Sequence, residues 1–279
     1  MRVPSLLPYS FSDSLAKAAR LLRRSRQVVV FTGAGISAES GIPTFRDAGG
    51  LWEAFPPNQF ATPEGLAEVA MASPRRLADF LTAAFGPLLA ARPNPGHLAI
   101  AALEKRVNVT VITQNIDNLH TAAGSSNVHE VHGSLFRRMS DSGKVLGPIS
   151  TESLAKMVGK LKDTEDVSFA RLARALRPLW GITRRGSYRP TIVLFGEPLA
   201  EPDWTLARNA ATTCDCFLSV GTSGEVMPAA MLPSVARSAG APVIGINPRR
   251  GDCDVFLQGP AGKVLPNLLE AAFGESPLV

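Results

Sequence analysis

The sequence predicts an α/β fold: a doubly wound parallel (Rossmann-like) sheet with a smaller, mainly helical second domain formed by two insertions. Five short runs are rich in β-branched residues and apolar on both faces, which is typical of parallel strands covered by helices. Segments with helical spacing alternate with these runs, as in doubly wound sheets. Two long stretches break the alternation, and these predict the insertions. The five runs are residues 28–31, 109–112, 191–195, 216–220 and 242–246 of the 279-residue chain.

The helical spacing is clearest before the first run. Leu15 and Leu22 lie seven residues apart with two alanines between them at the i+3 and i+4 positions, which places all four on one helix face. Ser12 or Asp13 is the expected N-cap, because both side chains accept hydrogen bonds from the first turn. The sequence therefore predicts an amphipathic helix before the first strand.

The two interruptions are expected to pack together as the second domain. Residues 35–95 contain a loop with many Gly and Pro, followed by helix-like pieces, and residues 133–189 contain a charged, helix-like stretch. The remaining residues, 10–34, 96–132 and 190–279, are expected to form the Rossmann-like domain.

Composition excludes several classes of protein. The net charge of +5 comes from Lys and Arg scattered in short runs, so nucleic-acid binding is not expected. The chain has neither a signal-peptide apolar region nor about 18 consecutive uncharged apolar residues, which predicts a cytoplasmic protein without a membrane anchor. Cys214, Cys216 and Cys253 do not have the spacing of a disulfide framework or a zinc knuckle. No metal site is expected.

Small or polar residues follow each predicted strand. In an open parallel sheet, ligands bind outside the carboxyl ends of the strands. One such end alone is better explained by a solvent-facing turn, but five together favour one shared crevice. The residues after the five runs are Thr32, Gly33, Ala34, Gly35 and Ile36; Thr113, Gln114, Asn115, Ile116 and Asp117; Gly196 and Glu197; Gly221, Thr222 and Ser223; and Asn247.

Gly33 and Gly35 allow the backbone to approach a pyrophosphate closely at the start of a helix. A Gly-Ala-Gly turn alone is a weak signal, and a purely structural turn explains it as well. The chain contains neither a Walker sequence nor a G-x-S-x-G motif.

Among the four histidines, His132 is the candidate general base. It follows an apolar segment and precedes Gly133, so it lies at the end of an element, where a neutral imidazole can accept a proton. A capping or core histidine is the alternative. The other three, His97, His120 and His129, have apolar or helical neighbours and are expected to be structural or solvated.

The motifs "GAGISAESGIPTFR", "TQNIDNLHTAAG", "VHGS", "FGE", "VGTS" and "IN" resemble those of the sirtuins, NAD-dependent protein lysine deacylases, in order and spacing over about residues 28–262. The resemblance implies NAD as cofactor and the acylated lysine of a protein as substrate. It implies catalytic roles for His132, as general base, and Asn115. The implied NAD-binding residues are Gly33, Ala34, Gly35, Ile36, Ser37, Phe45, Arg46, Gln114, Asn115, Ile116, Asp117, Gly221, Thr222, Ser223, Asn247 and Ala261. The implied substrate-binding residues are Phe195, Gly196 and Glu197.

The activity implied is deacylation, with acetyl as the expected acyl group, releasing nicotinamide and O-acyl-ADP-ribose. A mono-ADP-ribosyltransferase or NAD glycohydrolase using the same cleft is the alternative, and a non-catalytic NAD-binding module is less favoured. Two departures from the family pattern matter. No Cys lies between Gly133 and Arg189, where typical sirtuins carry a four-cysteine zinc site, so a zinc-independent variant is expected. The helical stretch "LADFLTAAFGPLL" lacks the Tyr-x-x-Arg of relatives that prefer acidic acyl groups.

Overall fold

The computed structural model describes residues 10–45, 49–162, 167–183 and 186–274. Its centre is a six-stranded sheet in which every strand pair is parallel, as predicted. The strand order is β10-β9-β8-β1-β2-β3, so the direction of winding reverses between β1 and β8. The strands are β1 (Gln27–Thr32), β2 (Asn108–Thr113), β3 (Val128–Glu130), β8 (Cys216–Val220), β9 (Val243–Asn247) and β10 (Val255–Gln258).

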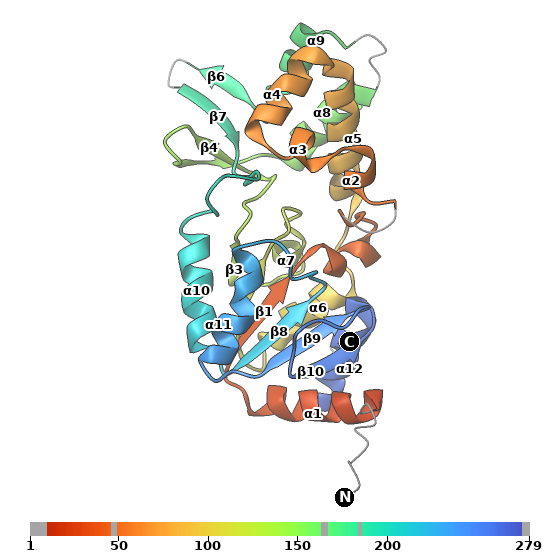
Figure 1. The fold of residues 1–279 in the computed structure, drawn as a ribbon, viewed down its shortest axis with the longest axis vertical. Coiled ribbons are helices and arrows are strands. Elements are labelled where there is room, and N and C mark those ends of the chain that lie inside the picture. The colour runs from red at the N-terminus through yellow and green to blue at the C-terminus, as the bar shows by residue number, and fades with distance from the viewer. Residues whose placement is uncertain (1–9, 46–48, 163–166, 184–185, 275–279) are drawn as a thin grey trace, which may run out of the picture.

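Helices cover both faces of this sheet (Figure 1), which explains why its strands are apolar on both sides. One core packs β1, β2, β8, β9 and β10 against three helices; the other packs the opposite face against two. The first three helices are α1 (Phe11–Arg24), α6 (Pro95–Leu103) and α12 (Ala261–Phe273). The other two are α10 (Asp203–Thr213) and α11 (Leu232–Ser238).

Helix α1 begins two or three residues earlier than expected. Its N-cap is Ser10, whose Oγ accepts a hydrogen bond from the Asp13 N–H at 3.2 Å. The prediction of Ser12 or Asp13 as cap was wrong, because Phe11 already belongs to the helix. Asp13 instead lies in the first turn, where the positive end of the helix dipole stabilises its carboxylate.

A second unit lies beyond the carboxyl ends of the strands, in the upper half of Figure 1. Its separate apolar core draws all of its buried members from residues 60–88 and 135–179, within the two predicted insertions. The boundaries of those insertions stay a prediction. The helices are α2 (Leu51–Ala54), α3 (Pro57–Phe60), α4 (Pro63–Ala72), α5 (Pro74–Ala90), α8 (Thr151–Lys162) and α9 (Phe169–Ala175).

The second unit also contains a four-stranded antiparallel sheet, which the prediction of a mainly helical domain missed. Its strands are only three to five residues long and, in sequences such as "RRMS" and "GSYRP", lack an alternating apolar pattern. The strands are β4 (Arg137–Ser140), β5 (Val145–Pro148), β6 (Gly181–Thr183) and β7 (Gly186–Pro190), in the order β5-β4-β7-β6.

The prediction of a strand at residues 191–195 was wrong. This segment follows β7 without joining a ladder, although it is as apolar as the true strands. The Val193 N–H donates to the His132 carbonyl at 2.9 Å, and the Phe195 N–H donates to the Ala61 carbonyl at 2.8 Å. His132 follows β3 of the parallel sheet, and Ala61 lies between α3 and α4 of the second unit. The segment therefore bridges the two units. Throughout the described residues, the helices are too short or too polar to cross a bilayer.

Candidate functional site

The switch point between β1 and β8 brings two glycine turns into contact. The Gly33 N–H donates to the Val220 carbonyl at 3.1 Å, and the Gly35 N–H donates to the Gly221 carbonyl at 2.8 Å. A Cβ on Gly35 would lie 2.8 Å from the Gly221 Cα, and Gly221 itself has a φ of +61°. Only glycine fits this close backbone approach. The two glycine turns therefore meet at the position where doubly wound sheets bind nucleotides.

Polar side chains connect the ends of three strands beside the two glycine turns. The Gln114 Nε2 donates to the Thr222 Oγ1 at 3.0 Å, and the Asn247 Nδ2 donates to the Thr222 carbonyl at 3.0 Å. Ser223 is exposed next to them. Ala261 is buried at the start of α12, where its carbonyl carbon lies 3.2 Å from the position a Cβ on Gly96 would take. Ala261 therefore belongs to the packing of α12 against α6.

A buried polar network lies next to the Gly33 turn. The Ser37 side chain, only 1% exposed, donates to the Asp117 Oδ2 at 2.7 Å and accepts from the Asn115 Nδ2 at 3.1 Å. The Asn115 Nδ2 also donates to the Gly33 carbonyl at 3.2 Å. Burial raises the pKa of Asp117 above its usual value, although hydrogen bonds from Leu119 and Ser37 oppose this. The network fixes the positions of Asn115 and Asp117.

His132 is held by its neighbours in one orientation. Its Nδ1 lies 3.1 Å from the Gln114 carbonyl, which can only accept, so Nδ1 carries the proton and the neutral ring keeps Nε2 free as an acceptor. Burial lowers the pKa of His132, with the hydrogen bond to Gln114 acting in the opposite direction. Gly133 has a φ of +71°, and a Cβ there would collide with the Thr191 carbonyl. Glycine therefore makes possible the turn that follows the base.

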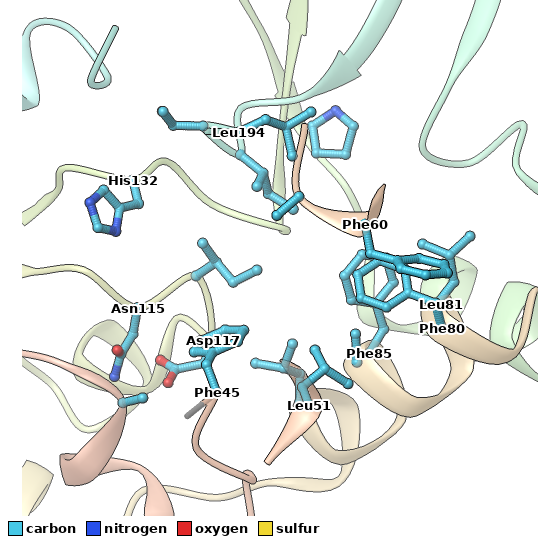
Figure 2. A pocket seen from close by; sticks show the side chains of 18 of the residues that line it. Phe45, Leu51, Phe60, Phe80, Leu81, Phe85, Asn115, Asp117, His132 and Leu194 are labelled. Atoms are coloured by element: carbon cyan, nitrogen blue, oxygen red, sulfur yellow. The ribbon is translucent and has the colours of Figure 1, made fainter. Parts of the chain in front are cut away.

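One cavity of about 230 Å³ brings several of these residues together. Figure 2 shows His132, Asn115 and Asp117 on one side and the side chains of Phe60, Phe80, Leu81 and Phe85 on the other. The predicted site residues that line the cavity are Ala34, Ser37, Phe45, Gln114, Asn115, Ile116, Asp117, His132 and Phe195. Other predicted residues are placed outside this lining: Gly33, Gly35, Ile36, Gly196, Glu197, Gly221, Thr222, Ser223, Asn247 and Ala261. Arg46 lies outside the described residues.

Sequence reasoning missed the apolar half of the cavity. Leu81, Ala84, Phe85 and Leu88 line it from α5 with the spacing of one helix face, and Trp180 adds an indole from the second insertion. Such a stripe is indistinguishable in sequence from an ordinary core-facing helix. Only the fold shows that this face borders a cavity next to the polar network.

Sequence reasoning also missed Arg189, which lines the cavity. Its guanidinium forms two hydrogen bonds with the Glu197 carboxylate, at 2.6 and 3.1 Å. Glu197, predicted to flank the substrate, thus directs its side chain to Arg189. Gly196 is exposed with a φ of +90°. No motif signals this pair, because the two residues are brought together by a turn.

The remaining histidines are structural or paired. Burial lowers the pKa of His97 to about 4 and that of His120 to about 3. His129 lies 3.4 Å from Asp203. Over the described part of the chain, His, Cys, Asp and Glu do not form a group of three or more that could hold a metal ion.

Two glycine turns at the switch point of a doubly wound sheet are typical of the Rossmann-like, nucleotide-binding class of fold. The model of the Sir2 family, the sirtuins, matches residues 33–228, and the chain belongs to this family. It is 44% identical to NAD-dependent protein deacylase 2 of Pyrobaculum aerophilum over 258 residues, which cover 90% of this chain and 93% of that protein.

Two solved structures are similar over nearly the full length. A complex of a Sir2 homologue with NAD has a TM-score of 0.72 at 31% identity, covering 92% of this chain and 93% of that one. Sir2Af2 bound to a myristoylated histone peptide has a TM-score of 0.67 at 34% identity, covering 94% of this chain and 97% of that one.

Proposed function

We propose that this protein is an NAD-dependent protein lysine deacylase that releases nicotinamide and O-acyl-ADP-ribose. One observation carries the proposal. A single cavity joins the Asn115–Asp117 network, the free Nε2 edge of His132 and an apolar chamber suited to an acyl group. The Pyrobaculum relative, an NAD-dependent protein deacylase, supports the same activity.

The residues of the two glycine turns and their neighbours fit NAD. Gly33, Gly35 and Gly221 let the two turns pack closely, because a Cβ on any of them would lie within 3.0 Å of backbone atoms of the other turn. Glycines in such turns also permit the close approach of a pyrophosphate. Ala34, Ile36, Ser37, Phe45 and Arg46 would complete this turn and the loop that follows it. Gln114, Thr222, Ser223, Asn247 and Ala261 would border the ribose and adenine.

The chain's own groups then have distinct roles. Bound NAD would supply an electrophilic ribose carbon and a nicotinamide leaving group. Asn115 and Asp117 orient the carboxamide and the ribose, since the Ser37 network holds both side chains. Ile116, beside them, contributes an apolar contact. His132 accepts a proton from a ribose hydroxyl at Nε2, because its Nδ1 is engaged with Gln114.

We infer that the acyl group is uncharged and that chains longer than acetyl bind more tightly. Phe60, Phe80, Leu81 and Phe85 line the apolar side of a cavity whose total volume is about 230 Å³, more than a methyl group needs. Burial of each additional methylene is worth about 0.8 kcal/mol. The myristoylated peptide bound by Sir2Af2 supports a long-chain substrate. Acetyl remains a substrate in this proposal.

Three further properties belong to the proposal. The protein works without zinc, because the stretch between Gly133 and Arg189 has no Cys and apolar packing supports the second unit. It acts in the cytoplasm on acylated lysines of proteins, which Phe195, Gly196 and Glu197 border at the cavity mouth. It does not require nucleic acid or a membrane.

Nicotinamide release separates this function from its alternatives. The protein is mixed with NAD, with and without an acyl-lysine peptide. Release that requires the peptide supports a deacylase. Release without peptide would indicate a glycohydrolase or ADP-ribosyltransferase, and NAD binding without release would indicate a non-catalytic module. A base such as His132 is not needed for transfer to an external nucleophile, so its presence favours deacylation.

A further inference from the structure

We propose that the Arg189–Glu197 pair determines which acyl groups the cavity accepts: Glu197 neutralises a cavity-lining cation and thereby excludes carboxylated acyl chains. This inference rests on the proposed deacylase function and deepens it. It concerns a contact that no sequence motif marks.

Arg189 is the one Lys or Arg among the described residues that line the cavity. It enters from the end of β7, and its side chain remains 32% exposed. The other cavity-lining side chains on the second unit are almost all apolar, including Phe80, Phe85 and Trp180. A free guanidinium in such surroundings would attract a carboxylate strongly, because hydrogen bonds to charged groups are the stronger ones.

Glu197 already supplies that carboxylate. Its Oε1 lies 2.6 Å from the Arg189 Nη2, and its Oε2 lies 3.1 Å from Nη1. This two-pronged geometry is the favoured one for an Arg–carboxylate pair. The pair is partly buried, with Glu197 only 22% exposed, so water screens it less than it screens a surface pair.

Backbone contacts hold both members in place. The Arg189 Nη1 also donates to the Ile192 carbonyl at 3.3 Å, and the Leu194 N–H donates to the Glu197 Oε2 at 2.9 Å. The intervening Val193 is tied to the His132 carbonyl at 2.9 Å. The ion pair therefore fixes the 190–197 wall of the cavity in position and keeps both Nη atoms of Arg189 engaged with Glu197.

The consequence concerns specificity. With the pair intact, the wall carries no net charge and favours uncharged chains. With Glu197 neutralised, Arg189 becomes a free cation at the same wall, and a carboxylated acyl group such as succinyl becomes a suitable ligand. The absence of the Tyr-x-x-Arg pattern from α5 does not affect this site, because Arg189 belongs to the other insertion.

The test compares two peptides that differ in the acyl group on lysine, succinyl and butyryl. Their affinities are measured by fluorescence anisotropy, which requires no turnover. In the Glu197→Gln variant, the ratio of succinyl to butyryl affinity should rise roughly 10-fold to 100-fold over that of the unmodified protein, the worth of one hydrogen bond to a charged group. Combining Glu197→Gln with Arg189→Gln should abolish this gain.

Glu152→Gln is the matched control, because Glu152 forms a pair of the same 2.6 Å length with Lys156 on the solvent-exposed face of α8. An unchanged affinity ratio in Glu197→Gln would overturn the proposal, as would equal losses for both peptides, which would indicate a purely structural pair. Nicotinamide release by the unmodified protein tests the deacylase function separately. A shifted ratio without turnover would support the specificity role and count against the function alone.

Discussion

Filling the apolar chamber should shorten the range of acyl chains that the enzyme accepts. Ala84 lies in the middle of α5 and lines the cavity between Leu81 and Leu88. Ala84→Leu adds three carbon atoms on this face. The helix itself should tolerate the change, because leucine is nearly as good a helix former as alanine.

The expected magnitude follows from the space removed. Each displaced methylene forfeits about 0.8 kcal/mol of burial, so three displaced groups cost a long chain about 2.4 kcal/mol, or roughly 60-fold in kcat/KM. An acetyl group carries only one methyl beyond its carbonyl. It should therefore keep its kcat/KM within about 3-fold, less than the worth of one methylene.

The assay is nicotinamide release with a series of peptides carrying acetyl, butyryl, octanoyl or myristoyl lysine. Ala90→Leu provides the control, because Ala90 lies on the same helix but is exposed and outside the cavity lining. A loss that is equal for all four chain lengths, or an unchanged rate with the myristoyl peptide, would refute the assignment of this chamber to the acyl chain.

Four further predictions address the chemistry and the fold. His132→Ala should lower turnover by roughly 10²–10⁴ while leaving NAD affinity and nicotinamide exchange less affected; equal loss of exchange and deacylation would assign it to cofactor positioning. Because burial lowers the pKa of His132, its neutral form persists through neutral pH, and the rate in a pH profile should fall only below the ordinary histidine value of about 6.5; a fall beginning above pH 7 would contradict this. Asn115→Ala or Asp117→Ala should abolish nicotinamide release measured by chromatography, whereas full activity in both would remove the NAD assignment. Exhaustive chelation should leave the unfolding temperature and the rate unchanged, and a stoichiometric zinc lost together with structure would show that the second unit depends on metal.

The strands that the sequence predicted correctly are those in which burial on both faces dictates composition. β1, β2, β8 and β9 lie in the interior of the sheet, and each consists mainly of apolar residues, although Thr110 interrupts the run in β2 and Ser219 that in β8. β3 is an edge strand of three residues and β10 an edge strand of four, which is too short for such a run to be distinctive. Residues 191–195 have the right composition but bond to two loops, a tertiary arrangement that local pattern does not encode.

The candidate site divides in the same way. Gly33 and Gly35 follow a recognisable strand, and His132 lies at the end of an element, so their positions along the chain were enough to predict them as site residues. The groups that orient these residues come from other parts of the chain and are brought close only by the tertiary fold. The Gln114 carbonyl fixes the ring of His132, and the Arg189–Glu197 pair forms across a turn that no strand pattern announces.

The central claim is that the acyl group leaves lysine for the sugar of NAD and not for water. Mass spectrometry of a single-turnover reaction with NAD and an acylated peptide measures this directly. We expect nicotinamide, free-lysine peptide and O-acyl-ADP-ribose to appear in equal amounts. Free carboxylic acid with intact NAD, or ADP-ribose formed while the peptide keeps its acyl group, would contradict it.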